Sequence, residues 1–275
     1  CFLHRSAVTG SPFEYLPFNH PLYVLFSSGT TGRPKCIVHG AGGTLLQHQK
    51  EHLLHTGLGC DDVLFYFTTC GWMMWNWLVS ALACGSTVVT YDGAPGYPDL
   101  NTLWQMADTT GVTVFGCSAS FIEASMKAGL SPRLASDTSR IRTVLSTGSP
   151  LSAEGFRWVY ENVDSNLMLA SISGGTDIVS CFVLGNPNLP VFAGHIQCVG
   201  LGMDVVAVDP SGTPVVGEKG ELVCRRPFPS MPVGFWEDPG GRKYQEAYFM
   251  SYPGWWHHGD YLEITPQHGI VIYGR

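Results

Sequence analysis

Short apolar runs alternate with amphipathic stretches through the first two thirds of the chain. Apolar runs bounded by turn residues are typical of strands, and apolar residues at helical spacing indicate helices. The pattern predicts strands over residues 21–27, 62–68, 86–91, 112–117 and 142–146, and helices over residues 43–54, 72–84, 100–110 and 152–162. Ser152 stands where the last of these helices needs an N-cap. The alternation predicts an α/β fold of layered sheets with crossover helices.

The pattern changes near residue 191. Short apolar runs at residues 205–208, 221–224 and 269–273 are separated by turns rich in proline and glycine, such as D-P-S-G-T-P. Runs of this kind are typical of short strands joined by tight turns. We therefore divide the chain into an α/β part, residues 1–190, and a smaller β-rich subdomain, residues 191–275.

Charge and hydropathy exclude two classes of protein. The 275 residues carry 15 Lys and Arg against 22 Asp and Glu, a formal net charge of −7, and contain no long basic run. The electrostatic footprint of a nucleic-acid-binding protein is therefore missing, and we expect small-molecule partners instead. The longest apolar stretch, residues 72–84, contains Asn76 and is shorter than the roughly 20 residues that cross a bilayer. We expect no membrane span.

The nine cysteines are scattered and include no C-x-x-C pair. An odd number of cysteines in mostly apolar surroundings predicts reduced, buried thiols rather than a disulfide framework or a zinc site. Reduced thiols are typical of the cytosol, so the sequence favours a cytoplasmic protein.

The loop between the first strand and Lys35 reads S-S-G-T-T-G-R-P-K and begins at Ser27. It does not fit the P-loop pattern of NTPases, because Cys36 stands where that pattern needs a magnesium-binding hydroxyl. Its chemistry is still that of an anion cradle: glycines let backbone N–H groups approach a phosphate, hydroxyls add donors and Lys35 adds a charge. From composition alone, a polar surface turn remains the alternative.

The extended string Y-V-L-F-S-S-G-T-T-G-R-P-K closely resembles the phosphate loop of the adenylate-forming superfamily, which includes acyl-CoA synthetases, luciferases and the adenylation domains of peptide synthetases. Further segments follow in that family's order: G-W-M-M-W, S-T-G-S-P, S-G-G-T-D, H-G-D and Y-G-R. These ordered matches run across nearly the whole chain. Within the superfamily, I-S-G-G-T-D-I, G-E-L-V-C and W-W-H-H-G-D look most like the acyl-CoA synthetases that act on acetoacetate.

The resemblance implies contacts to ATP. It assigns the β- and γ-phosphates to Ser27, Ser28, Gly29, Thr30, Thr31, Gly32 and Lys35, and the adenine to Gly148, Ser149, Pro150, Ser171, Ile172 and Ser173. It assigns the ribose to Asp260 and Arg275. Out of context, Gly-Ser-Pro and Gly-Asp are also ordinary turn sequences.

The same resemblance makes Thr176 and Asp177 candidate catalytic residues beside Lys35. Thr176 matches the family's hydroxyl donor to the α-phosphate, and Asp177 matches the magnesium-side carboxylate, where the family usually has Glu. Aspartate keeps the hard oxygen ligand that Mg²⁺ prefers, although its reach is shorter. Taken alone, a Thr-Asp pair is also a common helix cap.

The candidate acyl pocket comes from two segments. In acetate-specific relatives a tryptophan occupies the position matching Gly174, so Gly174 here implies room for an acid longer than acetate, and the neighbouring Gly175 is assigned to the same pocket. Trp72, Met73, Met74 and Trp75 could line the same pocket, although aromatic and methionine clusters are also ordinary core.

Three histidines, His48, His52 and His55, share one face of a predicted helix. Such a face could bind a metal ion, but there is no H-E-x-x-H motif, and the neighbouring Gln47, Gln49 and Lys50 indicate a solvated face instead. No cysteine or serine lies in a G-x-S-x-G elbow, so covalent acyl-enzyme chemistry has no support.

The resemblance thus implies an acid–thiol ligase that uses ATP, Mg²⁺ and coenzyme A. Acetoacetate would be activated as acetoacetyl-AMP with release of pyrophosphate, and the thiol of coenzyme A would then displace AMP. In this family a decisive lysine lies in a C-terminal domain that follows the Gly-Arg pair, and we expect that domain to lie outside this chain. Three rival readings stay open: a medium-chain acyl-CoA synthetase, a peptide-synthetase adenylation domain and a non-catalytic nucleotide-binding protein.

Overall fold

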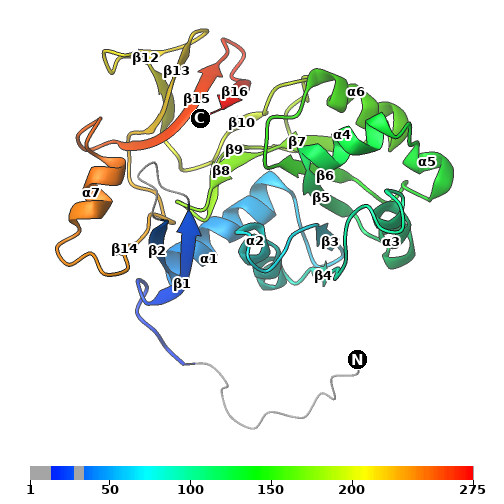
Figure 1. Cartoon of the computed structure of the whole chain (residues 1–275), viewed down its shortest axis with the longest axis horizontal. Helices are drawn as coiled ribbons and strands as arrows, with labels where there is room; N and C mark the ends of the chain where they lie inside the picture. The colour runs from blue at the N-terminus through cyan, green and yellow to red at the C-terminus, as the bar shows by residue number, and fades with distance from the viewer. Residues whose placement is uncertain (1–13, 28–33, 275) are drawn as a thin grey trace.

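The computed structural model describes residues 14–27 and 34–274, which form a mixed α/β fold (Figure 1). A parallel sheet and its helices make up one side of the molecule, and antiparallel sheets make up the other. The predicted fold class is therefore confirmed.

The parallel sheet has five strands in the order β4-β3-β5-β6-β7, and every pair of neighbouring strands in it is parallel. The strands are β3 (Val63–Tyr66), β4 (Thr87–Val89), β5 (Val114–Ser118), β6 (Thr143–Thr147) and β7 (Met168–Ser171). The predicted runs at residues 62–68, 86–91, 112–117 and 142–146 are confirmed as four of them. Strand β7 was not predicted.

Successive side chains of these strands enter different hydrophobic clusters because strand side chains alternate between the two faces. Phe65, Phe115 and Val144 lie in one cluster with the helices α3 (Thr102–Thr110), α4 (Ala119–Lys127) and α6 (Ala153–Asn162). Leu64 and Val114 lie in another, with α2 (Met74–Ser80). Apolar layers on both faces are what a parallel sheet requires.

Helix α6 begins as the sequence predicts. Ser152 is its N-cap, and the Ser152 hydroxyl accepts a hydrogen bond from the Gly155 N–H at 3.1 Å. The predicted helix at residues 43–54 is α1 (Ala41–Lys50), continued by a π-helical turn, η1 (Glu51–His55). The predicted helix at residues 72–84 is α2 followed by a 3-10 turn, η2 (Ala81–Cys84). The short helix α5 (Pro132–Ala135) follows α4.

Three antiparallel sheets complete the described part of the chain. One has the order β12-β11-β13-β15-β16, with β11 (Val205–Val208), β12 (Pro214–Val215), β13 (Lys219–Cys224), β15 (Trp256–Ile264) and β16 (Ile270–Gly274). The other two are β1-β2-β14 and β10-β9-β8, with β1 (Pro21–Ser27), β2 (Lys35–Gly40), β14 (Gly234–Phe235), β8 (Ser173–Gly175), β9 (Ser180–Leu184) and β10 (Cys198–Val199). Helix α7 (Arg242–Tyr248) lies beside them.

The region after residue 191 is rich in strands, as the sequence predicts. Two sheets nevertheless join strands from both sides of residue 190, because β9 pairs with β10 and β2 pairs with β14. The division of the chain at residue 190 stays a prediction.

Eight cysteines lie in the described residues, and all are free. Cys117, Cys181 and Cys224 are buried as predicted, but Cys60 and Cys70 are exposed, so the prediction of buried thiols is wrong for those two. Among the described residues, none of the helices combines the length and the apolar character needed to cross a bilayer.

Candidate active site

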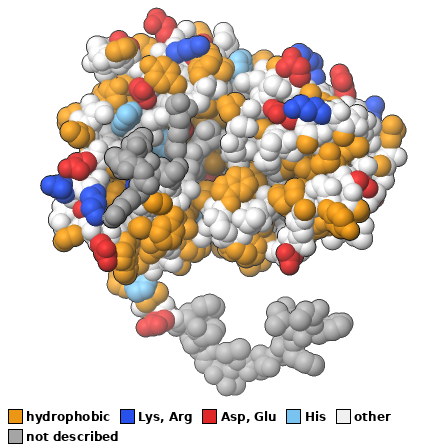
Figure 2. Space-filling view, viewed as in Figure 1, with side chains coloured by type: hydrophobic (Ala, Val, Ile, Leu, Met, Phe, Trp, Pro, Cys, Tyr) orange, Lys and Arg blue, Asp and Glu red, His pale blue; other side chains and the backbone are white. Residues whose placement is uncertain are grey.

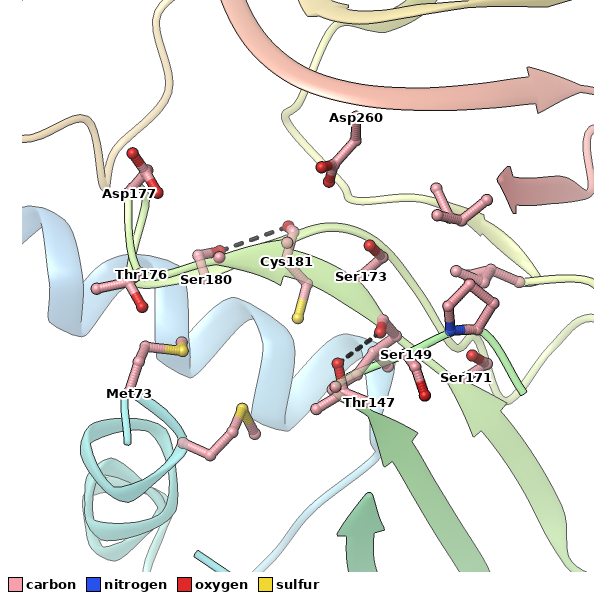
Figure 3. Close-up of a pocket in the computed structure, with 18 of the residues that line it drawn as sticks. Met73, Thr147, Ser149, Ser171, Ser173, Thr176, Asp177, Ser180, Cys181 and Asp260 are labelled. Atoms are coloured by element: carbon pink, nitrogen blue, oxygen red, sulfur yellow. Dashed lines mark hydrogen bonds between the residues drawn. The ribbon is translucent and has the colours of Figure 1, made fainter. Parts of the chain in front are cut away.

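A cavity of about 550 Å³ lies between the parallel sheet and the antiparallel strands (Figure 3). Its walls come from the ends of β6 and β7, from the β8–β9 hairpin, from the start of α2 and from β15. In the close-up, β9 crosses the centre with Ser180 and Cys181, Met73 lies below it, and Asp260 lies above. Segments far apart in the sequence therefore meet here.

The predicted adenine residues follow two neighbouring strands of the parallel sheet. Gly148, Ser149 and Pro150 come directly after β6, and Ile172 comes directly after β7. The Thr147 hydroxyl donates to the Ile172 carbonyl at 2.8 Å and links the two loops. Carboxyl ends of adjacent parallel strands are the usual place for a nucleotide in α/β folds.

Thr176 and Asp177 lie in the loop of a tight hairpin. Strands β8 and β9 pair through Gly174 with Cys181 and Gly175 with Ser180, which leaves residues 176–179 as the loop. The Val179 N–H donates to the Thr176 carbonyl at 3.3 Å across the loop. Both candidate catalytic residues therefore stand on a defined turn at the edge of the cavity.

Asp177 is 2% exposed and accepts bonds from two directions. Lys35, at the start of β2, forms an ion pair with its carboxylate, and the Tyr248 hydroxyl of α7 donates to the same oxygen at 2.6 Å. Burial alone would raise the pKa of Asp177, but Lys35 and these hydrogen bonds hold that pKa below its ordinary value. Asp177 is therefore an anion at neutral pH.

Tyr248 is a site residue that the sequence analysis missed. Its ring stacks on Trp256 with centroids 3.7 Å apart, and the Lys35 ammonium lies 4.8 Å from the centroid of the Tyr248 ring. No local motif marks Tyr248, because its contact with Asp177 depends on how α7 packs against the hairpin.

Asp260 lies on β15, is 6% exposed and lines the cavity. His258, which belongs to the same H-G-D segment, places its Nε2 atom 3.5 Å from an Asp260 oxygen and 3.4 Å from the Gly174 carbonyl. The segment thus touches the hairpin that carries Thr176. Arg275 lies outside the described residues.

The phosphate loop is described only at its two ends. Ser27 ends β1 and lines the cavity, and it pairs in register with Lys35 of β2. The predicted phosphate-binding residues Ser28, Gly29, Thr30, Thr31 and Gly32 lie outside the described part of the chain.

Gly174 stands where two strands approach closely. A β-carbon added to Gly174 would lie 2.1 Å from the Ser180 carbonyl oxygen, so this backbone accepts only glycine there. The structure therefore gives the residue a packing role that the sequence analysis did not foresee. That its missing side chain makes room for a longer acid stays a prediction.

The predicted acyl-pocket residues divide into two groups. Trp72, Met73 and Gly175 line the cavity together with Cys181, which the sequence analysis missed. Trp75 is not among the residues that line it and packs against the hydrophobic cluster around α2 instead.

The prediction of a solvated histidine face is wrong. His48, His52 and His55 share one helix face as expected, but each is at most 1% exposed. They bond the carbonyls of Val179, Trp77 and Gly185 respectively. Burial lowers the pKa of all three, and that of His52 to about 3, so they are neutral. Within the described residues, no group of three or more His, Cys, Asp or Glu could hold a metal ion.

Comparisons with known proteins identify relatives of this chain. Residues 6–235 match the family model described as AMP-binding enzyme. The acetoacetyl-coenzyme A synthetase of Rhizobium meliloti (strain 1021) is 61% identical over 263 residues, which cover 96% of this chain and 40% of that protein. The acetoacetyl-CoA synthetase of Gallus gallus is 51% identical over 264 residues, with the same coverage of 96% and 40%.

A solved structure of another acetoacetyl-CoA synthetase also matches this chain. The acetoacetyl-CoA synthetase from Streptomyces lividans matches with a TM-score of 0.93 and 49% identity, over 98% of this chain and 42% of that one. The chain thus spans about 40% of the length of the curated relatives it matches. The match of residues 6–235 confirms the resemblance read from the motifs, and the chain belongs to the family of AMP-binding enzymes.

Proposed function

We propose that the complete gene product carrying this chain is an ATP-dependent acid–thiol ligase that converts acetoacetate, ATP and coenzyme A into acetoacetyl-CoA, AMP and pyrophosphate. The observation that carries this proposal is the hairpin loop with Thr176 and the anionic Asp177, held at a cavity edge beside Lys35. The names of the relatives, at up to 61% identity, support the choice of acid.

The assignments of the site residues imply one orientation for a nucleotide in the cavity. Adenine would lie by the loops after β6 and β7, and the ribose hydroxyls would donate to the buried Asp260 carboxylate. The α-phosphate would then face Thr176, and the β- and γ-phosphates would face the loop between Ser27 and Lys35. This order leaves the side of Met73 and Cys181 for the acyl group.

The donor set also fits a magnesium ion. Mg²⁺ is usually held by one or two carboxylates together with substrate phosphates, so a site with only one protein carboxylate is sufficient. Asp177 would hold the ion, and the bound ion would neutralise charge on the phosphates.

The chain's own residues would act by placing and neutralising charge. In the first step a carboxylate oxygen of acetoacetate attacks the α-phosphorus, and the bond to the bridging oxygen of pyrophosphate breaks. The Thr176 hydroxyl would donate to the α-phosphate oxygens, which gain charge. The Lys35 ammonium would leave the Asp177 carboxylate and contact the phosphates instead. In the second step the coenzyme A thiol loses its proton to solvent, its sulfur attacks the acyl carbon, and the bond from that carbon to the phosphate oxygen of AMP breaks. Such preorganised donors contribute mainly through electrostatics and proximity.

The partners of the protein are then small molecules, and we place it in the cytoplasm. Eight free cysteines in the described residues, two of them exposed, suit a reducing compartment.

The test is ATP–pyrophosphate exchange by the complete gene product, with acetoacetate compared against acetate, butyrate, octanoate and a panel of amino acids. Exchange selective for acetoacetate is the expected result. Preference for another acid would keep the adenylation chemistry and overturn the substrate, and exchange with none of the acids would overturn the ligase.

A further inference from the structure

The loop that carries Thr176 and Asp177 contains a strained residue. Val179, its last residue, has φ of +48° and is fully buried. A β-branched side chain is a clear outlier in the left-handed region. A strained conformation of this kind persists only where the surrounding structure holds it in place. The question is therefore which contacts hold loop residues 176–179.

One contact comes from β2. The His39 Nε2 atom lies 2.9 Å from the carbonyl oxygen of Thr176, the first loop residue. Lys35, Ile37 and His39 share one face of β2, because strand side chains alternate. Lys35 reaches the Asp177 carboxylate from the other end of that face. Side chains on one face of β2 therefore contact the loop at two places. Lys35 contacts the side chain of Asp177, and His39 contacts the backbone carbonyl of Thr176.

The second contact comes from α1. The His48 Nε2 atom lies 2.5 Å from the carbonyl oxygen of Val179, the last loop residue, and its Nδ1 atom lies 2.9 Å from the Ser80 hydroxyl of α2. His39 and His48 are 1% and 0% exposed. Because a carbonyl oxygen only accepts, both imidazoles must carry their proton on Nε2. The two rings thus donate to the two ends of the loop.

His39 makes little use of its other nitrogen. In the described part of the chain, its Nδ1 atom is buried and has no hydrogen-bond partner. An unpaired buried polar atom lowers the stability of the folded protein. An apolar side chain at this position would avoid that cost, so packing does not explain why a histidine stands there. Burial also lowers the pKa of His39 to about 4, which keeps the ring neutral.

We propose that His39 and His48 are positioning residues: each donates its Nε2–H to a carbonyl at one end of loop 176–179, and together they hold Thr176 and Asp177 toward the nucleotide. The nucleotide rests on the proposed function, whereas the anchoring of the loop does not.

The test uses the complete gene product with substitutions that differ only in where a donor stands. His39→Gln keeps an amide donor near the position of Nε2, His39→Asn moves it back toward Nδ1, and His39→Leu removes it; the same three changes are made at His48. We measure hydrogen exchange of the Ile178 and Val179 amides, KM for Mg²⁺·ATP in pyrophosphate exchange, and thioester formation from synthetic acyl-adenylate.

We expect the asparagine and leucine variants to raise loop exchange and KM for Mg²⁺·ATP roughly tenfold, because one buried hydrogen bond is lost. Thioester formation from acyl-adenylate should change less than KM for Mg²⁺·ATP, because acyl-adenylate keeps the α-phosphate that Thr176 would contact but lacks the β- and γ-phosphates. The glutamine variants should stay near the wild type. If the leucine variants do not fold, the comparison between glutamine and asparagine decides.

His55→Leu is the matched control. His55 is equally buried but bonds the Gly185 carbonyl at 2.8 Å and the Leu201 N–H at 3.0 Å, away from loop 176–179. It should lower Tm without changing loop exchange. The proposal is overturned if asparagine and leucine at both positions leave loop exchange unchanged, or if His55→Leu raises it equally. If the wild type shows no acid-dependent ATP–pyrophosphate exchange, only the proposed function is overturned. Hydrogen exchange of the loop amides still reports on whether His39 and His48 hold the loop.

Discussion

At the residue scale, the site depends on how one carboxylate is held. Asp177 accepts from Lys35 and from Tyr248, and these partners come from opposite ends of the chain. Hydrogen bonds to an ionised group are stronger than those between neutral groups. Under the proposed function, Tyr248 would orient Asp177 while Lys35 exchanges the carboxylate for a phosphate.

Tyr248→Phe tests this role because it removes the hydroxyl and keeps the ring on Trp256. We expect ATP–pyrophosphate exchange by the complete gene product to fall roughly tenfold, the equivalent of one hydrogen bond to a charged group. Tyr244→Phe, on the same helix α7 and also in the aromatic cluster, should leave the rate near that of the wild type. Equal losses in both variants would assign the effect to aromatic packing.

Gly174 gives a second prediction at this scale. Because a β-carbon there would lie 2.1 Å from the Ser180 carbonyl oxygen, Gly174→Ala should lower the free energy of unfolding by about 1–3 kcal/mol. Gly59→Ala is the control, since its nearest atom would lie 4.0 Å away. Denaturant unfolding of both variants measures the difference, and equal stability would show that β8 and β9 can separate at no cost.

At the element scale, the helix formed by α1 and η1 has an inverted polarity. Its histidines and Glu51 are buried, whereas Leu45, Leu46, Leu53 and Leu54 are 44% to 54% exposed. Glu51 accepts from Trp77 Nε1 at 2.9 Å and from the Cys181 N–H at 3.2 Å, so its carboxylate is satisfied inside the protein. The buried face works as a polar connector between α2 and the β8–β9 hairpin.

This connector makes stability depend on pH. Burial lowers the pKa of His52 from 6.5 to about 3, so the unfolded chain takes up a proton before the folded protein does. Stability should therefore be complete above pH 6.5 and fall by up to about 1.4 kcal/mol per pH unit for this group as the pH drops toward 3. Urea unfolding from pH 7 to pH 4 measures the slope, which His52→Gln should reduce. If His52→Gln leaves the slope unchanged, groups other than His52 take up the proton on unfolding.

At the scale of the whole molecule, residues of the parallel sheet and of the antiparallel sheets line the same cavity. On the face shown in Figure 2, hydrophobic side chains gather in the region of β1, where Leu22, Val24 and Phe26 are exposed. Residues on both sides of the cavity would contact one nucleotide, since Ser149 follows β6 and Asp260 lies on β15.

Bound nucleotide should therefore stabilise the folded protein. At a concentration of about 100 times Kd, AMP should add about 2.7 kcal/mol and raise Tm of the complete gene product. Asp260→Ala should reduce this shift, and Asp92→Ala, at an exposed aspartate that is not among the residues lining the cavity, should not. Thermal unfolding with and without AMP provides the measurement, and the same shift in both variants would argue against a ribose contact at Asp260.

The sequence by itself determined several of the elements and the family. Short apolar runs bounded by turn residues predicted four strands of the parallel sheet, and Ser152 predicted the start of α6. Both signals lie within a few neighbouring residues. The ordered motifs identified Thr176, Asp177 and Asp260, all of which line the cavity.

Only the tertiary structure decided what these residues touch. The helical spacing put His48, His52 and His55 on one face, but whether that face meets water depends on α2 and β9, which pack against it. Tyr248 meets Asp177 across 71 residues, and Lys35 meets it across 142. A local pattern fixes which side chains share a face, whereas burial and contact are set by distant segments that fold against that face.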